Sequence, residues 1–330
     1  MMKFLNASSA IALTLLTSSV LVYQNCVPAK FSILNNDNLN GAASTPTGPG
    51  PGTCQTVTQV SVPMRIIVAI DNTGSNGSNR YSVQQPPGGY SFGLGSDNDQ
   101  YFRQKSTNDL VASLSRLSNI SYNLMVFQDL ATVNWRPTAQ RQGPNVRSLI
   151  NIAGNDQLPT YGDASEMTNA LQNLQKLEQD GPTEYFSVIE LIHSAIVNDH
   201  AFASGNQDYA VVFLSDGQPT ERTLIDSTGA AVTRAWNEAQ DEADLLAEIK
   251  ALVALSPGHV TFNTVFYNDL TPAQRDALKT PAYDPIDPEA PGLLQKMATA
   301  GLGQFANANV QGADHVQLSN VITVPSATCH

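Results

Sequence analysis

The chain has 330 residues, 42% of them hydrophobic and 14% charged, and its formal net charge is −12 at neutral pH. This composition is typical of a folded protein, and the length is sufficient for one large domain with a buried core. Because an acidic surface repels the phosphate backbone of nucleic acids, we expect no nucleic-acid partner.

Residues 1–25 have the pattern of an export signal. Lys3 gives a positive start, and the apolar run that follows is too short and too rich in Ser and Thr for a membrane span. The stretch Leu21-Val22-Tyr23-Gln24-Asn25-Cys26 resembles a bacterial lipobox, although Gln24 and Asn25 stand where small residues are usual. We expect lipidation of Cys26, with ordinary secretion or an uncleaved anchor as the alternatives.

Residues 26–53 are rich in Asn, Gly, Pro, Ser and Thr, which indicates a flexible tether ahead of a single domain at 54–330. Cys54 lies just before the first expected strand, and Cys329 is the penultimate residue. Domain termini often lie close together, and an exported protein meets an oxidising compartment. We therefore expect a disulfide between Cys54 and Cys329, with two unrelated thiols as the alternative.

Strands and amphipathic helices alternate along the domain. Continuous apolar runs at 64–70 and 209–214 predict strands buried on both faces, as in a parallel sheet. We expect further strands at 120–127, 132–135, 259–267 and 303–306, with 132–135 antiparallel to its predecessor. Helices are expected at 107–118, 165–178, 184–197, 236–255, 293–300 and 312–322. This alternation predicts a doubly wound α/β fold with right-handed crossovers.

Two insertions interrupt the pattern. Residues 76–105 are loop-like, with glycines, prolines and aromatic residues, and residues 268–292 carry five prolines and five acidic residues. Loops of this length are often functional or mobile. Because aromatic side chains beside glycines suit a recognition surface, we expect residues 76–105 to supply selectivity, with a lid over the sheet edge as the alternative.

Polar loops flank three of the expected elements. Asp71, Thr73 and Ser75 follow the strand at 64–70, Thr183 precedes the helix at 184–197, and Asp216 follows the strand at 209–214. In an open α/β sheet, ligands bind beyond the carboxyl ends of the strands, where the strand order reverses. Two carboxylates and three hydroxyls there would form an all-oxygen site. Such a site suits Mg²⁺, with Mn²⁺ or Ca²⁺ as alternatives.

These motifs together resemble the metal ion-dependent adhesion site of von Willebrand factor A domains. They are Asp-x-Thr-x-Ser after a strand, Gly-x-Thr before a helix, and Leu-Ser-Asp-Gly-x-Pro-Thr after another strand. The resemblance covers residues 54–325 and implies a three-layer, Rossmann-like fold. Its six-stranded sheet would have the order 3-2-1-4-5-6, with one antiparallel edge strand.

The resemblance also implies roles for the site residues. Thr73 and Ser75 would bind the metal directly, Thr183 directly or through water, and Asp71 and Asp216 mainly through water. Thr73 stands where the family usually has Ser and keeps the hydroxyl. The implied function is adhesion-type binding, at the cell envelope, of a protein or surface ligand that presents a carboxylate to Mg²⁺. We expect the protein to be an outer-membrane lipoprotein, attached to the membrane only through its lipid.

Two alternatives remain open. A structural domain of an envelope complex could keep the fold with a vestigial metal site. A hydrolase could use Asp71 as a nucleophile, but the phosphatase motif of haloacid dehalogenases needs a second Asp where Thr73 stands. Asn72 interrupts the Asp-Thr-Gly loop of aspartic proteases, and the five histidines lack metalloprotease spacing. We therefore expect no catalytic residue and no enzymatic activity.

Overall fold

The computed structural model describes residues 59–73, 82–85, 89–92, 101–115, 117–127, 146–174, 177, 183–225, 231–267, 289–308 and 317–322. The expected export signal, the tether, and all three cysteines, Cys26, Cys54 and Cys329, lie outside these residues. Among the described helices, none is both long enough and apolar enough to cross a membrane.

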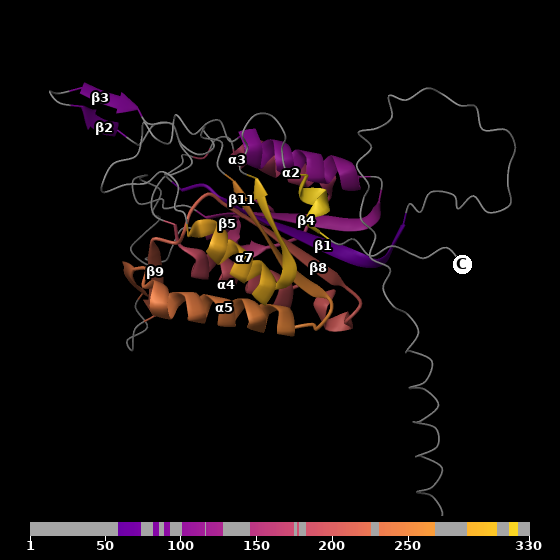
Figure 1. Ribbon diagram of the computed structural model, residues 1–330. Helices are drawn as coiled ribbons and strands as arrows, with labels where there is room; N and C mark the ends of the chain where they lie inside the picture. Colours follow the sequence, from indigo (N-terminus) through magenta and orange to yellow (C-terminus); the bar gives the residue numbers. More distant parts are fainter. Residues whose placement is uncertain are drawn as a thin grey trace, which may run out of the picture.

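A six-stranded sheet forms the middle layer of the domain (Figure 1), in the order β12-β11-β8-β1-β4-β5. Its strands are β1 (Gln59–Asp71), β4 (Ser118–Phe127), β5 (Val146–Ser148), β8 (Asp208–Ser215), β11 (Val260–Tyr267) and β12 (Leu302–Ala308). All neighbours pair in parallel except β5, which is antiparallel to β4 at the edge. Numbered along the chain, this order is 3-2-1-4-5-6, which confirms the expected doubly wound α/β fold.

Helices cover both faces of the sheet (Figure 1). One face carries α2 (Tyr101–Leu114) and α3 (Ala164–Leu174), and the other carries α4 (Tyr185–Val197), α5 (Glu238–Ala254) and α7 (Ala290–Ala300). Successive side chains of a strand point to opposite faces, so β1 contributes to two separate cores. Ile67 packs in the core under α4, and Val68 packs in the core under α2. Both are fully buried, as the continuous apolar run predicts.

The antiparallel edge strand is β5, Val146–Ser148, and the expected position at 132–135 is wrong. Residues 132–135 themselves lie outside the described part of the chain. In the sheet, Phe127 at the end of β4 pairs with Val146. The connection between the two strands therefore spans residues 128–145, and the edge strand begins later in the chain than the sequence suggested.

The first insertion is not loop-like throughout. Residues Ser82–Gln85 (β2) and Gly89–Phe92 (β3) pair as an antiparallel hairpin. Helix α2 begins at Tyr101 rather than at 107, because Phe102 and Ser106 extend the buried face of Leu110 by two further turns. The last residues of the predicted insertion therefore belong to the helical layer.

The expected closing helix at 312–322 is, in its described part, a single 3₁₀ turn, η3 (Leu318–Asn320). The backbone of Gln317 is extended, with φ −75° and ψ 106°, so no helix enters this turn from its N-terminal side. Leu318 and Val321 pack in the core beside α2. Residues 317–322 therefore still cover the sheet, as a 3₁₀ turn in place of this part of the predicted helix.

Two further hairpins were not expected from the sequence. Strands β6 (Asn151–Ile152) and β7 (Asn155–Pro159) precede α3, and strands β9 (Glu221–Ile225) and β10 (Ala231–Ala235) precede α5. A 3₁₀ turn, η2 (Phe202–Ser204), joins α4 to β8. The β9–β10 hairpin matters for the site, because it begins directly after the predicted third loop.

Candidate functional site

The predicted loops meet at the carboxyl ends of β1 and β8. These strands are parallel neighbours, with Ile70 opposite Leu214, so Asp71 and Ser215 end them side by side. The chain leaves β1 for the face of α2, whereas it enters β8 from α4 on the opposite face. The strand order therefore reverses between β1 and β8, and this reversal is where ligands of open α/β sheets bind.

Asp71 accepts hydrogen bonds on both carboxylate oxygens. The amide and the hydroxyl of Thr73 donate to Oδ1 at 3.0 and 2.6 Å, and the hydroxyl of Ser215 donates to Oδ2 at 2.6 Å. The hydroxyl of Thr183 donates to that of Thr73 at 3.2 Å. All four residues are buried. Oxygen atoms from three loops that are distant in the sequence thus meet in one place.

Tyr185, the first residue of α4, holds the third loop. Its hydroxyl lies 2.8 Å from the hydroxyl of Ser215 and 2.5 Å from the carbonyl oxygen of Gly217. Asp216 lies between these two residues and is only 5% exposed. The residues on both sides of Asp216 therefore contact the helix that follows the second loop.

The second and third loops are also joined directly. The amide of Thr220 donates to the carbonyl of Thr183 at 2.8 Å, and the amide of Thr183 donates to the hydroxyl of Thr220 at 2.9 Å. Glu184, next in the chain, caps α4 by accepting a hydrogen bond from the amide of Ser187 at 2.8 Å. This cap fixes where the helix begins, and thereby where Thr183 lies.

Burial dominates the electrostatics of the site. It raises the pKa of the Asp71 carboxyl above its usual value, against the opposing effects of hydrogen bonds from Ser215 and Thr73 and of the Arg103 charge. Burial likewise raises the pKa of Glu184, although the amide of Ser187 stabilises its charged form. A cation close to Asp71 would favour the ionised carboxylate.

The structure thus brings three of the five predicted site residues together, namely Asp71, Thr73 and Thr183. Asp216 is buried one residue beyond Ser215, and Ser75 lies outside the described residues. Two further residues at the site, Ser215 and Tyr185, are not among the five that the sequence predicts. Ser215 could have been found as the last residue of a strand beside β1, whereas nothing distinguishes Tyr185 from an ordinary core tyrosine.

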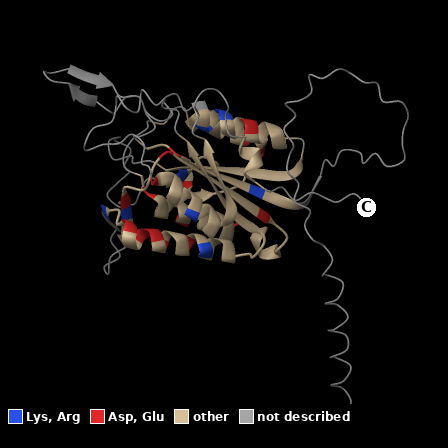
Figure 2. Cartoon of the chain, in the orientation of Figure 1, with Lys and Arg blue, Asp and Glu red and all other residues tan. Residues whose placement is uncertain are grey.

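The donor set mixes carboxylates with hydroxyls. Within the described ranges, no three His, Cys, Asp or Glu residues cluster closely enough to hold a metal ion. Figure 2 shows that acidic residues are concentrated instead on α5, near its N-terminus. Any cation site at the ends of β1 and β8 would therefore combine two carboxylates with neutral oxygen atoms.

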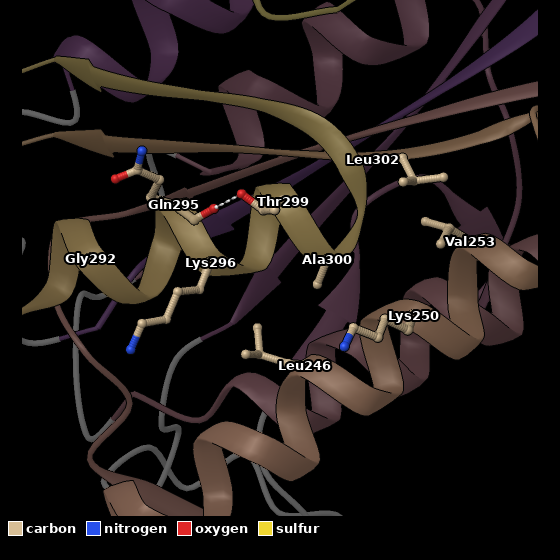
Figure 3. Close-up of a pocket in the computed structure, with 9 residues that line it drawn as sticks. All are labelled: Leu246, Lys250, Val253, Gly292, Gln295, Lys296, Thr299, Ala300 and Leu302. Atoms are coloured by element: carbon tan, nitrogen blue, oxygen red, sulfur yellow. Dashed lines mark hydrogen bonds between the residues drawn. The ribbon is translucent and has the colours of Figure 1, made fainter.

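A groove of about 820 Å³ lies elsewhere, between α5 and α7 (Figure 3). Its walls include the aliphatic side chains of Leu246, Val253 and Leu302, together with Lys250 and Lys296. The residues that line it include no Asp, Glu, His or Cys, and none of the predicted site residues. The groove is therefore separate from the candidate site.

No protein-family model and no curated protein sequence matches the chain. Solved structures similar to it include the PilB minor pilin from Streptococcus sanguinis, with 13% identity, 79% of this chain and 59% of that chain covered, and a TM-score of 0.42. The open conformation of the pilus adhesin SpaC from Lactobacillus rhamnosus GG is 12% identical. That match covers 76% of this chain and 28% of the SpaC chain, with a TM-score of 0.45.

A third similar structure is proximal thread matrix protein 1 from the mussel byssus, with a zinc-occupied MIDAS motif. The two sequences are 12% identical, and the match covers 77% of this chain and 43% of the mussel protein, with a TM-score of 0.40. The chain spans less than two thirds of the length of each of these three proteins. Likeness at this level assigns no function to the chain.

Proposed function

We propose that the chain is an adhesion-type, ligand-binding domain whose site holds a divalent cation. Asp71, Thr73, Ser75, Thr183 and Asp216 would hold the cation, as in the von Willebrand factor A domains that the sequence resembles. The observation that carries the proposal is the hydrogen-bonded meeting of Asp71, Thr73 and Thr183 at the point where the strand order reverses.

The chemistry of the donors fits a small, hard cation. Magnesium prefers oxygen ligands, keeps several waters and takes one or two protein carboxylates, which matches two aspartates and three hydroxyls. Mn²⁺ and Ca²⁺ have related preferences. A bound cation would supply an open coordination position for an acidic group of a partner.

The surrounding residues orient these donors. Ser215 donates to the Asp71 carboxylate and is itself held by Tyr185, and Thr220 holds the main chain of Thr183. Such outer contacts fix ligand side chains in place before a metal arrives. We propose no catalytic role for Asp71, because Thr73 stands where the second carboxylate of the phosphatase motif would be needed.

We further propose an exported domain, tethered at the cell envelope through lipidated Cys26 and closed by a disulfide between Cys54 and Cys329. Its partner would be a protein or surface ligand that presents a carboxylate. The insertion at 76–105 begins directly after the first loop, so its residues would contact such a partner. The structural alternative, with a vestigial metal site, differs in one measurable property, which is the affinity for Mg²⁺.

The test is titration calorimetry of the full chain with Mg²⁺, using two matched variants. Asp216 follows the end of β8, and Asp208 begins the same strand, where it contacts His259 at 2.7 Å. We expect one Mg²⁺ per chain, affinity at least about tenfold lower in Asp216→Asn, and unchanged affinity in Asp208→Asn. Asp216 is preferred to Asp71, because Asp71 accepts hydrogen bonds that hold the loops together.

A thermal readout checks the result independently. Ligand at about 100 times its Kd adds roughly 2.7 kcal/mol to the free energy of unfolding, so saturating Mg²⁺ should raise Tm, and a chelator should reverse the rise. The absence of Mg²⁺, Mn²⁺ and Ca²⁺ binding by the wild type would overturn the proposal in favour of the structural alternative. Equal metal affinity in Asp216→Asn and Asp208→Asn would place the ion elsewhere.

A further inference from the structure

Two side chains outside the proposed ligand set hold the first loop from behind. Nη1 of Arg103, in the first turn of α2, donates to the carbonyl oxygen of Asp71 at 2.5 Å and to Oδ1 of Asn72 at 3.0 Å. The hydroxyl of Tyr267, the last residue of β11, donates to the same Asp71 carbonyl at 3.2 Å. Two elements that are distant in the sequence thus converge on one peptide group.

The opposite side of that peptide is held as well. The amide of Asn72 donates to the carbonyl of Phe127, the last residue of β4, at 2.9 Å. The carbonyl and the amide of the Asp71–Asn72 peptide are therefore both bonded, to α2 and β11 on one side and to β4 on the other. A peptide held in this way cannot rotate without breaking hydrogen bonds in a buried environment, which is costly.

Burial distinguishes these contacts from ordinary surface hydrogen bonds. Arg103 is fully buried, and Tyr267 is 1% exposed. A buried guanidinium is tolerated only where hydrogen bonds and charges compensate its lost hydration. The guanidinium lies 6.0 Å from the centre of the Tyr267 ring, and Phe102 stacks on that ring at 5.3 Å. Arg103 and Tyr267 therefore also contact each other.

We propose that Arg103 and Tyr267 form a clamp that positions the metal loop without touching the metal. By fixing the backbone of Asp71 and Asn72, the clamp turns the side chains of Asp71 and Thr73 toward Ser215 and Thr183. This inference rests on the proposed metal site for its functional meaning. Changes to residues that orient metal ligands typically lower metal affinity about 10- to 100-fold, which sets the size of the expected effect.

The test compares clamp variants with matched controls on the same sheet. Six residues before Asp71 in β1, Nε of Arg65 donates to Asp199 at 2.9 Å, and the hydroxyl of Tyr209 donates to the same carboxylate at 3.0 Å. Arg65→Met and Tyr209→Phe thus remove an arginine and a tyrosine hydroxyl that meet on one acceptor far from the loop. They match Arg103→Met and Tyr267→Phe in chemistry.

Two measurements are made on the full chain. Titration calorimetry should show about 10- to 100-fold weaker Mg²⁺ binding for Arg103→Met and a smaller loss for Tyr267→Phe, which removes one longer hydrogen bond. Arg103→Lys should recover part of the loss, because an ammonium group can still donate to the Asp71 carbonyl. Residue-resolved hydrogen exchange in metal-free protein should show faster exchange of the Asn72 and Thr73 amides in Arg103→Met and Tyr267→Phe than in the wild type.

The outcomes separate the clamp from the metal site. A wild type that binds no divalent cation would refute the proposed function, and hydrogen exchange alone would then decide whether the clamp exists. Wild-type metal affinity in both Arg103→Met and Tyr267→Phe would overturn the clamp, as would unchanged exchange at Asn72 and Thr73. Should Arg103→Met fail to fold, Arg103→Lys and Tyr267→Phe provide the same comparison.

Discussion

Asp241→Asn should lower the free energy of unfolding substantially, because Asp241 is the buried centre of an ion-pair network beneath the β9–β10 hairpin. Its Oδ1 accepts from Arg222 and Arg234 at 2.6 Å each, and its Oδ2 accepts from Arg234 and from the amide of Asn237 at 2.7 Å each. The Asp241 side chain is fully buried. The network therefore fixes the hairpin that follows the third loop to the start of α5.

The size of the loss follows from the burial of the partners. Removing one member of a buried ion pair costs about 3–5 kcal/mol, because the other charge stays behind uncompensated. The Arg222 and Arg234 side chains are 14% and 34% exposed, and Arg222 also pairs with Asp244 at 2.6 Å. Both arginines thus keep some compensation, and we expect a loss of about 3 kcal/mol, at the lower end of that range.

The loss should depend on pH with a defined sign. Hydrogen bonds and charge from Arg234 and Arg222 hold the pKa of Asp241 well below its usual value near 3.9. A carboxyl with a lowered pKa in the folded state stabilises the protein above its unfolded-state pKa, and this contribution is lost as pH falls through the folded-state value. The difference between wild type and Asp241→Asn should therefore be constant from pH 7 to 5 and shrink below pH 4.

Urea denaturation at pH 7, 5 and 3.5 measures this difference. Glu242→Gln is the matched control, because Glu242 is the next residue of α5 and pairs with exposed Lys296 at 2.8 Å. Exposed pairs contribute little, so the control should lose much less stability than Asp241→Asn. Equal losses in the two variants, or a loss in Asp241→Asn that does not change with pH, would refute the reasoning.

Three further predictions concern the core. Phe213→Ala should lower the free energy of unfolding by about 3–5 kcal/mol in urea denaturation, because the ring is fully buried in the core under α4. Gly303→Ala should lower Tm, because an added Cβ would meet the backbone carbonyl of Phe262, whereas Gly292→Ala in α7 meets nothing within 4 Å and should not lower it. Burial raises the pKa of Tyr122 to about 12, so Tyr122 does not ionise near pH 10. In an absorbance titration, Tyr122→Phe should therefore show the same tyrosine ionisation near pH 10 as the wild type.

The fold could be predicted where burial of an element leaves a recognisable pattern of apolar residues in the sequence. The strands β1 and β8 are buried on both faces and are therefore continuously apolar, and α4 repeats apolar residues at helical spacing. The edge strand β5 has only three residues, too few to show a period. The β9–β10 hairpin carries charged residues that bond to α5, so its stability arises from contacts that local sequence does not reveal.

The positions of three candidate site residues could be predicted from the sequence, whereas the residues that hold them could not. Asp71, Thr73 and Thr183 stand at strand and helix ends, which a sequence can locate once the elements are assigned. Ser215 and Asp71 are 144 residues apart in the sequence, and their contact depends on the pairing of β1 with β8. Arg103 lies in a stretch that resembled a loop, and its bond to Asp71 follows from how α2 packs. As metal ligands, all five residues stay predictions, and Ser75 lies outside the described part of the chain.

The most direct measurement of the central claim is an anomalous difference map from crystals of the full chain soaked in Mn²⁺. The account predicts one strong peak beyond the ends of β1 and β8, bordered by the hydroxyls of Thr73, Ser75 and Thr183, and absent after a chelator soak. A map without a peak at that position, or with the three hydroxyls directed away from a common point, would contradict it.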